Sequence, residues 1–494
     1  MIVNQMNKIT IKVKTTPTHY GDAFEQFKKI TNNGKNIGLL MESRSKNLAY
    51  GKASIIVSNP PVRISCAKEE FKIEALTKKG EKILELFDKK DFNYADELKI
   101  EKNKITGVVK KEENNEIEEN KRTSQKNISM VLKTILEKFE CESDYCGLYG
   151  AFAYDFSKNF YKVEERFNET SNDFVLFLPT TIIFFDDIKE KAEKIEFDFG
   201  VSGEEKEEGV KGFEFTKQKK KIEYDLNDEE YLKSLKNVIE DIRNGRAMQC
   251  VLSRKISMPL QRDPIESYEE LREKIPAPYS YYYNLGENEI LYGASPEIHI
   301  KIFKSEIEIR PLAGTIQRKE NPLEDAEARI HLLTDEKEKR EHTMLVDLAR
   351  HELYNLCEAK SVRVDELFIL EEYPNLYHLV SDIKGKLKKE KNAIDALLVT
   401  LPAGTLSGAP KQESMKMIEE YEGSKREYYG GAIGYIAFNG ECNTGITIRS
   451  IHVKNNKSTI RGGGGVIALS TPKQEFAERK LKLEKMLEVL EEKK

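Results

Sequence analysis

The segment Pro402–Lys411 reads PAGTLSGAPK, and its paired glycines and prolines predict tight turns. A predicted helix, residues 411–421, follows it directly. A glycine-rich turn ahead of a helix presents free backbone N–H groups to an anion. Thr405 lies within this turn, where a hydroxyl can also serve only to start a helix. The segment therefore indicates an anion site without identifying the anion.

Two pairs of glutamates lie on either side of this segment along the chain. Glu338 and Glu341 are three residues apart on a predicted helix, and Glu475 and Glu478 repeat that spacing near residue 494. Residues three apart share one face of a helix. Four carboxylates without His or Cys suit a hard cation, Mg²⁺ in preference to zinc. Such pairs on Lys- and Glu-rich helices are more often only solvated, so the spacing leaves both interpretations open.

Three further features are equally ambiguous on their own. Gly462–Gly465 is a run of four glycines, which predicts a turn that either closes on an anion or is merely flexible. Arg449 lies in an alternating apolar stretch, where an arginine usually faces outward. His378 lies on an apolar segment, where a lone histidine is more often a satisfied core residue.

Composition excludes several classes of function. The 494 residues are 39% hydrophobic with a net charge of −5, so nothing favours nucleic acid or an anionic membrane. No apolar run approaches the roughly 18 residues of a membrane span, and we expect a cytoplasmic protein. The six cysteines form no CxxC pair and no zinc spacing, so we expect buried free thiols.

The pattern of elements predicts an α+β fold with large antiparallel sheets, because strands and helices are mixed without strict alternation. Asn227 and Glu230 form a capping-box pattern ahead of one apolar helical stripe. The charged, glycine-punctuated stretch 200–221 predicts a domain boundary. Helices are expected at 323–333, 338–356, 393–400, 411–421 and 472–491. Strands are expected at 51–57, 174–186, 248–252, 279–284, 306–310, 432–438, 445–452 and 458–461.

The order and the amino-acid sequences of these segments, together with Pro311–Thr315 (PLAGT) and Glu338–His342 (EKREH), resemble those of the chorismate-utilising enzymes. Within that family they are most similar to the large subunit of anthranilate synthase. The resemblance is dense from about Tyr231 to Leu490 and thinner before. It implies a layered α/β sandwich of large mixed or antiparallel sheets. Residues 1–221 would form the N-terminal region of the component I type, and residues 222–494 the chorismate-binding catalytic domain.

The resemblance also assigns roles to individual residues. The Mg²⁺ ligands of the family match Glu341 and Glu478, with Glu338 and Glu475 in supporting positions. The expected substrate contacts are Tyr429, Arg449 on the pyruvyl carboxylate, Gly463 and Gly465 around a carboxylate of chorismate, and Lys482 near that carboxylate and the metal. Thr405 matches a residue near the ring, and His378 matches a histidine that handles protons during pyruvate loss.

Three positions distinguish the members of the family from one another. Gln249 matches the place where isochorismate and salicylate synthases carry a lysine that activates water, and a glutamine cannot act as that base. Arg310 stands where those relatives have an acid. Ala313 stands where many aminodeoxychorismate synthases carry a lysine. Together these positions predict ammonia as the nucleophile and amination at C2.

The resemblance therefore implies Mg²⁺-dependent conversion of chorismate and ammonia to anthranilate and pyruvate, the first step of tryptophan biosynthesis. The alternatives are 2-amino-2-deoxyisochorismate synthase, aminodeoxychorismate synthase and, outside catalysis, an inactive ligand-sensing or scaffold subunit. The family's usual GRND or ARND is here Ala349–Glu352 (ARHE), which is a warning sign for inactivity. No GxCxG cysteine is present, so we expect ammonia to come from a separate glutamine amidotransferase subunit.

Overall fold

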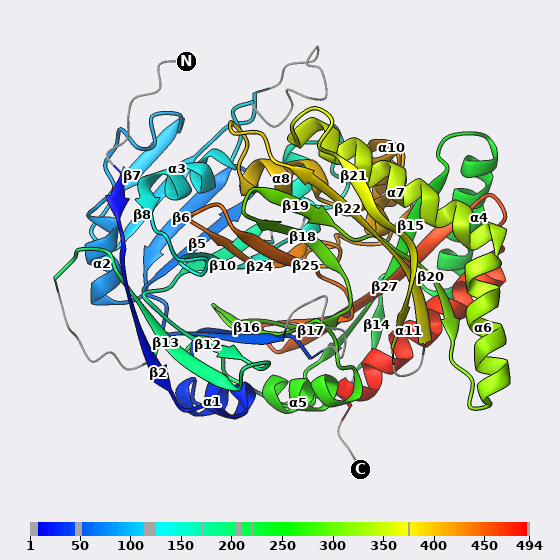
Figure 1. The fold of residues 1–494 in the computed structure, drawn as a ribbon, viewed down its shortest axis with the longest axis horizontal. Helices are drawn as coiled ribbons and strands as arrows, with labels where there is room; N and C mark the ends of the chain where they lie inside the picture. The colour runs from blue at the N-terminus through cyan, green and yellow to red at the C-terminus, as the bar shows by residue number, and fades with distance from the viewer. Residues whose placement is uncertain are drawn as a thin grey trace.

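The computed structural model describes residues 8–44, 52–112, 125–168, 171–202, 209–219, 221–373 and 376–491. Two large β-sheets lie face to face, and helices cover their outer sides (Figure 1). The predicted α+β fold with large antiparallel sheets is confirmed. Among these residues, no helix is both long and apolar enough to cross a membrane.

The first sheet contains 13 strands among the described residues. In spatial order they are β20 (Leu312–Gln317), β22 (Leu376–Lys386), β19 (Glu306–Ile309), β18 (Ile298–Phe303), β25 (Cys442–Ile446), β24 (Ala432–Ala437), β10 (Gly147–Phe152), β11 (Phe174–Leu178), β5 (Val62–Ala67), β6 (Glu70–Ala75), β8 (Lys104–Val108) and β7 (Glu97–Ile100), with β21 (Arg363–Glu372) on the free side of β22.

The second sheet contains 12 strands among the same residues. Their order is β14 (Glu223–Tyr224), β15 (Gln249–Pro259), β27 (Lys457–Ile467), β26 (Ser450–Lys454), β17 (Glu289–Ser295), β16 (Tyr279–Gly286), β3 (Gly38–Glu42), β4 (Ala53–Ser58), β12 (Thr181–Asp186), β13 (Lys191–Asp198) and β2 (Lys12–Thr18), with β23 (Gly408–Ala409) paired to β15. A separate short parallel pair joins β1 (Ile9–Thr10) and β9 (Phe139–Glu140).

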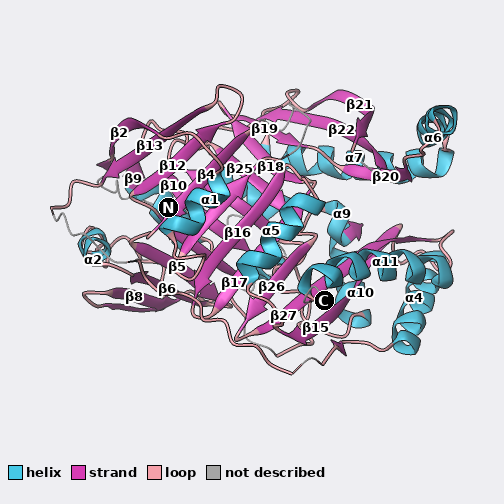
Figure 2. Ribbon diagram, turned by 90° about the horizontal axis from the view of Figure 1, so that it is seen from below, coloured by secondary structure: helices cyan, strands magenta, loops and turns pink. Residues whose placement is uncertain are grey.

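The helices gather in two places, on the outer faces and at one end of the sheets. They are α1 (Ala23–Ile30), α2 (Lys78–Leu84), α3 (Met130–Lys138), α4 (Asp228–Arg243), α5 (Pro264–Lys274), α6 (Pro322–Thr334), α7 (Glu336–Leu356), α8 (Ala393–Thr400), α9 (Gly404–Ser407), α10 (Lys411–Tyr421) and α11 (Pro472–Leu490), with a 3₁₀ turn at Tyr154–Asn159. Figure 2 shows α4, α6, α10 and α11 together at one end of the strands.

The amphipathic helices form where the sequence predicts them. Asn227 and Glu230 make both hydrogen bonds of the capping box at the start of α4. The apolar stripe that follows, including Tyr231, Leu235 and Val238, is buried. A cap together with an apolar stripe every three to four residues is a local signal, so these boundaries agree with the prediction to within about two residues.

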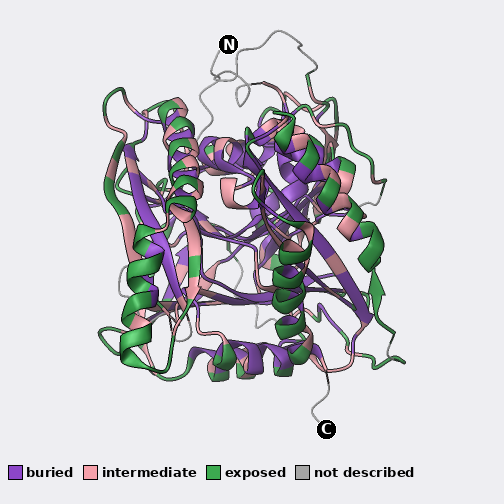
Figure 3. Cartoon of the chain, turned by 90° about the vertical axis from the view of Figure 1, so that its right-hand side faces the viewer, coloured by how far each residue is buried: buried purple, intermediate pink, exposed green. Residues whose placement is uncertain are grey.

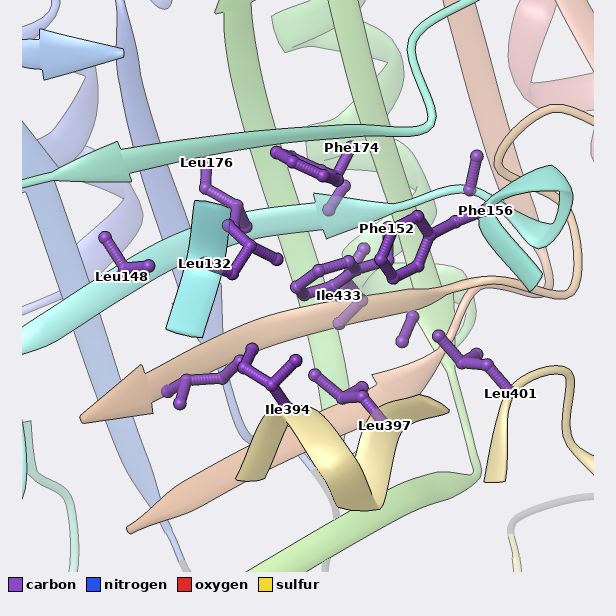
Figure 4. Close-up of a cluster of buried hydrophobic side chains, with 14 of the residues drawn as sticks. Leu132, Leu148, Phe152, Phe156, Phe174, Leu176, Ile394, Leu397, Leu401 and Ile433 are labelled. Atoms are coloured by element: carbon purple, nitrogen blue, oxygen red, sulfur yellow. The ribbon is translucent and has the colours of Figure 1, made fainter. Parts of the chain in front are cut away.

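The core is divided between the two faces of the second sheet. Along β16, Tyr281 and Tyr283 pack into the interior shared with the first sheet, whereas Tyr282 packs toward α1 and α5. Successive side chains of a strand point to opposite faces, so this strand is buried on both sides. On the outer face of the first sheet, Ile394 and Leu397 of α8 contact the strands around Phe152 (Figure 4).

Two strand predictions and one turn prediction are wrong. The run 174–186 divides into β11 and β12, which belong to different sheets. The run 445–452 likewise divides into β25 and β26, and Arg449 lies between them with φ of 49°. The four glycines expected in a turn instead extend β27 and pair with β15. In each case the tertiary pairing, which local sequence does not encode, decides where a strand ends.

Strands from both sides of residue 221 pair within both sheets. β10 lies beside β24 in the first sheet, and β3 lies beside β16 in the second. The proposed boundary stretch, 200–221, includes residues 203–208 and 220, which lie outside the described residues. The division at residue 221 stays a prediction.

Candidate active site

Several of the residues singled out by sequence lie on or beside α7 and α11, at one end of the sandwich. This end is built from the first turns of those helices, from β15, β22 and β27, and from the connections around α9 and Arg449. Figure 3 faces this end and shows buried strands between helices whose outer faces are exposed.

The four glutamates come from two helices and influence one another electrostatically. Burial raises the pKa of Glu338 and of Glu341 on α7, and carboxylates of α11 raise each further: Glu478 acts on Glu338, and Glu475 acts on Glu341. Lys337 opposes this effect, and its Nζ lies 3.6 Å from Glu341 Oε1. Two pairs of like charges therefore face one another.

The α11 carboxylates already have cationic partners. Glu475 Oε2 lies 2.6 Å from the Arg479 guanidinium, and Glu478 Oε1 lies 2.6 Å from Lys482 Nζ. Burial acts against the charge of Glu478, but Lys482 holds its pKa below the ordinary value. Thus the ionised form of Glu478 is favoured, as a metal ligand requires.

The donor set fits a partly hydrated Mg²⁺ better than a closed metal cage. No group of three or more His, Cys, Asp or Glu side chains in the described part of the chain is arranged to hold an ion by itself. Mg²⁺ usually takes one or two protein carboxylates and completes its octahedral shell with water and substrate oxygens. The carboxylates of α7 and α11 are chemically suited to such an ion, and the assignment of Glu341 and Glu478 as its ligands stays a prediction.

His378 presents an unused nitrogen inside the protein. Its Nδ1 lies 2.8 Å from Thr315 Oγ1 and 3.3 Å from the Gly314 carbonyl oxygen. Because a carbonyl can only accept, the bond to Gly314 assigns the proton to Nδ1. Nε2 is buried and has no hydrogen-bond partner among the described residues. Burial, assisted by Arg449 and Lys482, lowers the pKa of His378 to about 3, so Nε2 is a free base at neutral pH.

Glu297 is a site residue that the sequence reasoning missed. It lies between β17 and β18, is 5% exposed, and accepts a hydrogen bond of 2.8 Å from Thr405 Oγ1. Burial raises the pKa of Glu297 to about 8, although Thr405 and Arg449 act against the rise. The carboxyl is therefore mainly protonated at neutral pH. The signal available in the sequence was a single acid, in Ala294–Glu297 (ASPE), between two apolar strands.

The glycines of β27 leave room for neighbouring side chains. A Cβ on Gly463 would lie 2.8 Å from the hydroxyl oxygen of Tyr429, and one on Gly465 would lie 2.5 Å from Nε2 of Gln249. Both contacts are closer than real side chains allow. Lys482 Nζ donates to the Gly463 carbonyl across 3.4 Å. Gly463 and Gly465 thus bring Tyr429 and Gln249 to one face of the strand, whereas α11 packs against Gly462 and Gly464 on the other face.

Gln249 and Arg449 complete the polar lining. Gln249 is 5% exposed, and its Oε1 has no hydrogen-bond partner among the described residues. Arg449 occupies a left-handed conformation between two sheets and lies close enough to influence the pKa of both Glu297 and His378. Its positive charge can serve a carboxylate ligand at this point.

The ARHE segment is joined to the PAGTLSGAPK segment by an ion pair. Glu352 is buried and forms an ion pair with Lys411, the last residue of the PAGTLSGAPK segment. Lys411 Nζ also donates to the Thr400 carbonyl at 3.1 Å. The carboxylate at position 352 therefore holds the start of α10 against α7.

A sequence model described as chorismate binding enzyme matches residues 74–488. The chain belongs to this family. Among its relatives is the anthranilate synthase component 1 of Buchnera aphidicola, which is 32% identical over 89% of each chain. The component 1 of Acetivibrio thermocellus is 38% identical over 54% of each chain. The chain thus matches only about half the length of the Acetivibrio thermocellus protein.

Two solved structures agree with the fold. Anthranilate synthase component I of Streptococcus pneumoniae superimposes with a TM-score of 0.66 at 25% identity, covering 88% of this chain and 92% of that one. The menaquinone-specific isochorismate synthase of Escherichia coli gives the same TM-score at 15% identity and covers 98% of this chain and 95% of its own. The latter likeness concerns the fold alone.

Proposed function

We propose that the protein converts chorismate and ammonia to anthranilate, pyruvate and water, the first step of tryptophan biosynthesis. Family membership supports chorismate as the substrate, and relatives named anthranilate synthase component 1 support the reaction. The site offers a neutral base, a protonated acid and an uncharged amide, which are the groups that this reaction needs.

The observation that carries the proposal is the buried amide of Gln249, whose Oε1 has no partner among the described residues. An amide oxygen only accepts hydrogen bonds. It can orient the N–H groups of ammonia, which already carries a lone pair, but it cannot remove a proton from water. The site therefore favours amination over hydration.

Two buried groups supply the proton transfers. In the first stage ammonia forms a bond to C2, and the C4 hydroxyl leaves as water with the proton of Glu297. The ammonium group formed at C2 then gives up one proton, which restores the acid form of Glu297. In the second stage His378 Nε2 takes the C2 proton. The bond from C3 to the enolpyruvyl oxygen then breaks and the ring becomes aromatic. The leaving enolpyruvate takes up the proton that His378 accepted and becomes pyruvate. A general acid and a general base each contribute typically 10²–10⁴-fold to rate.

Glu341 and Glu478 would hold Mg²⁺, with Glu338 and Glu475 beside them. When bound, the ion neutralises and orients substrate carboxylates. Arg449 provides a second cationic contact, which suits a dianion with two separate carboxylates. Tyr429, Gly463 and Gly465 shape the surface on which the ring lies.

Ammonia would come from a separate glutamine amidotransferase subunit. A thiol route to glutamine hydrolysis needs an accessible thiolate, and the six cysteines of this chain are all buried. Burial raises the pKa of Cys66, Cys250 and Cys442 above its ordinary value. A hydrogen bond with Cys146 lowers the pKa of Cys141 to about 7, but this side chain is only 3% exposed. Burial therefore makes all six thiols poorly suited to attack on glutamine.

The test is turnover of chorismate by the purified chain with Mg²⁺ and ammonium above neutral pH, with products identified by mass. Anthranilate and pyruvate in equal amounts support the proposal. Accumulation of 2-amino-2-deoxyisochorismate would assign the reaction to its first stage only, and isochorismate formed without ammonia would refute the choice of nucleophile. Product from glutamine in the absence of a partner would refute the two-subunit arrangement.

A further inference from the structure

A cluster of four buried charges borders the glycine segment of β27. It consists of Arg426, Arg461, Glu422 and Asp225, whose side chains are at most 3% exposed. The two positive and two negative charges cancel. The cluster therefore adds no net charge that would attract a dianion, and its contribution must be sought in its geometry.

Glu422 is the centre of this cluster. It accepts hydrogen bonds of 2.7 Å from both the backbone N–H and the hydroxyl of Ser253, and of 2.9 Å from Arg461. Ser253 is the strand partner of Gly463 in β15, and Arg461 directly precedes the glycines. One carboxylate thus fixes both strands at the level where the substrate surface lies.

Arg426 extends the cluster to three other parts of the site. Its guanidinium donates to the carbonyl oxygens of Leu406 and Val251, each across 2.6 Å. It also donates to Glu422 at 3.0 Å and lies 5.6 Å from the ring centre of Tyr429. Because Leu406 follows Thr405 in α9, a single side chain connects α9, β15 and Tyr429.

Stability alone does not explain such a cluster. Removing charges from water is costly, and replacing a buried ion network with apolar side chains is often neutral or stabilising. A guanidinium, however, holds five N–H donors in fixed directions. It can therefore set the relative positions of two carbonyls and a carboxylate in a way that an apolar side chain cannot.

We propose that Arg426, oriented by Glu422, is a positioning residue that sets the spacing between α9, β15 and the ring of Tyr429. The inference rests on the proposed function, since that function gives Thr405 and Tyr429 their roles. The inference goes beyond the proposed function because it assigns the geometry of the substrate surface to Arg426, which lies next to the ring of Tyr429.

The first test is Arg426→Lys, which retains the charge next to Glu422 but loses the forked donation to Leu406 and Val251. A misplacement of about 1 Å can cost about 10²-fold in rate, so we expect kcat/KM for chorismate to fall about 10²-fold. The matched control is Arg63→Lys in β5, remote from the site. Arg63 is 1% exposed and donates to the Leu285 carbonyl at 2.9 Å and to Glu74 at 3.0 Å. The control should lose thermal stability yet keep kcat/KM.

A double-mutant cycle separates positioning from a general loss of stability. If Arg426 acts partly through Tyr429, the combined loss in Arg426→Lys/Tyr429→Ala will be smaller than the product of the two single losses. Glu422→Gln, which keeps the shape but removes the charge, should lower kcat/KM in the same direction. Assays are run well below each variant's unfolding midpoint.

Unchanged kcat/KM in either folded single variant, or multiplicative losses in the cycle, would overturn the positioning role. So would failure of both Arg426→Lys and Glu422→Gln to fold, which would assign the cluster to stability. If the wild-type chain binds chorismate without converting it, the proposed function fails. The affinity of the same variants for chorismate, measured by calorimetry, then decides the role of Arg426. Absence of chorismate binding by the wild type would refute both the proposed function and the positioning role of Arg426.

Discussion

Thr405 donates its hydroxyl hydrogen to the carboxyl of Glu297 across 2.8 Å, although the two residues are 108 positions apart in the chain. The contact joins a glycine-rich turn to the junction of two strands from different sheets. It also marks the acid of the site. A hydroxyl that donates to the carbonyl oxygen of a carboxyl group leaves the acidic proton free for another acceptor.

Glu297→Gln should abolish most of the activity. The amide has nearly the same shape and keeps the bond to Thr405, but it has no proton of suitable acidity, so kcat should fall by about 10²–10⁴-fold. Steady-state kinetics measure the effect. Glu441→Gln is the control, because burial also raises the pKa of Glu441 outside the site. Equal activities of Glu297→Gln and wild type would remove Glu297 from the mechanism.

The pH dependence follows from the direction of the Glu297 shift. Burial raises the pKa of this carboxyl to about 8, so the acid form is present below pH 8 and is lost above it. At a constant concentration of free ammonia, kcat/KM for chorismate should therefore decline as the pH rises beyond about 8. A profile that continues to rise to pH 10 under these conditions would contradict the assignment.

Metal binding should depend on both helices. Glu341→Gln and Glu478→Gln each remove a charged ligand, and we expect loss of activity with the fold intact. Calorimetric titration of Mg²⁺ in the presence of chorismate should show weakened binding in both variants. Glu484→Gln, further along α11, is the control. Full turnover of the wild type in EDTA would eliminate the metal from the proposal.

Gln249→Lys should change the nucleophile. It introduces a group that can deprotonate water at the place of the unpartnered amide oxygen, so amination should fall and a trace of isochorismate could be formed. Products are separated and identified by mass. Gln261→Lys, in the connection after β15, controls for an added charge. Undiminished amination in Gln249→Lys would separate Gln249 from nucleophile choice.

His452 should make the fold sensitive to alkali. Its Nε2 lies 2.7 Å from Glu289 and its Nδ1 lies 3.4 Å from Glu427, with Lys454 also facing Glu289. Burial opposes protonation, but these carboxylates raise the pKa of His452 to about 9. Because the pKa of His452 is higher in the folded state, protonated His452 stabilises the fold. This contribution is complete below the unfolded-state pKa of about 6.5 and is lost as the pH rises through 9.

The lost contribution amounts to roughly 3 kcal/mol of the free energy of unfolding, at 1.36 kcal/mol for each unit of pKa. Thermal unfolding measured from pH 6 to 10 should show a falling midpoint in the wild type and a flatter dependence in His452→Gln. Identical pH profiles in the two proteins would exclude His452 as the cause. Because the group is 8% exposed, salt should screen this effect only weakly.

Local patterns predicted the helices well and the strand ends poorly. The capping box before α4 and the carboxylate pairs on α7 and α11 depend on residues three or four apart, which a sequence displays directly. The break at Arg449 depends instead on the chain passing from one sheet to the other. Nothing in GITIRSIHV, residues 445–453, distinguishes that crossing from a continuous strand.

The same reasoning explains what was found and missed in the site. Thr405, His378 and Gln249 were predicted by resemblance. The structure shows their contacts with neighbouring residues, and their catalytic roles stay predictions. Glu297 carries no neighbouring motif, and its raised pKa arises from burial, which is a property of the folded chain. The glycines of β27 were read as a turn because a glycine run has no strand propensity, whereas here neighbouring side chains require their lack of a Cβ.

The sharing of both sheets between distant parts of the chain affects how the protein is made. Phe152 of β10 pairs with Ala432, and Tyr292 of β17 pairs with Ile451. During synthesis, residues 147–152 leave the ribosome long before their partners exist. The first sheet therefore cannot be completed until β25 has emerged, and the second sheet cannot be completed until β27 has emerged. Pairings so distant in sequence are slow to form and leave strand edges open to wrong contacts. We therefore expect chaperones to bind the nascent chain while these strand edges are exposed.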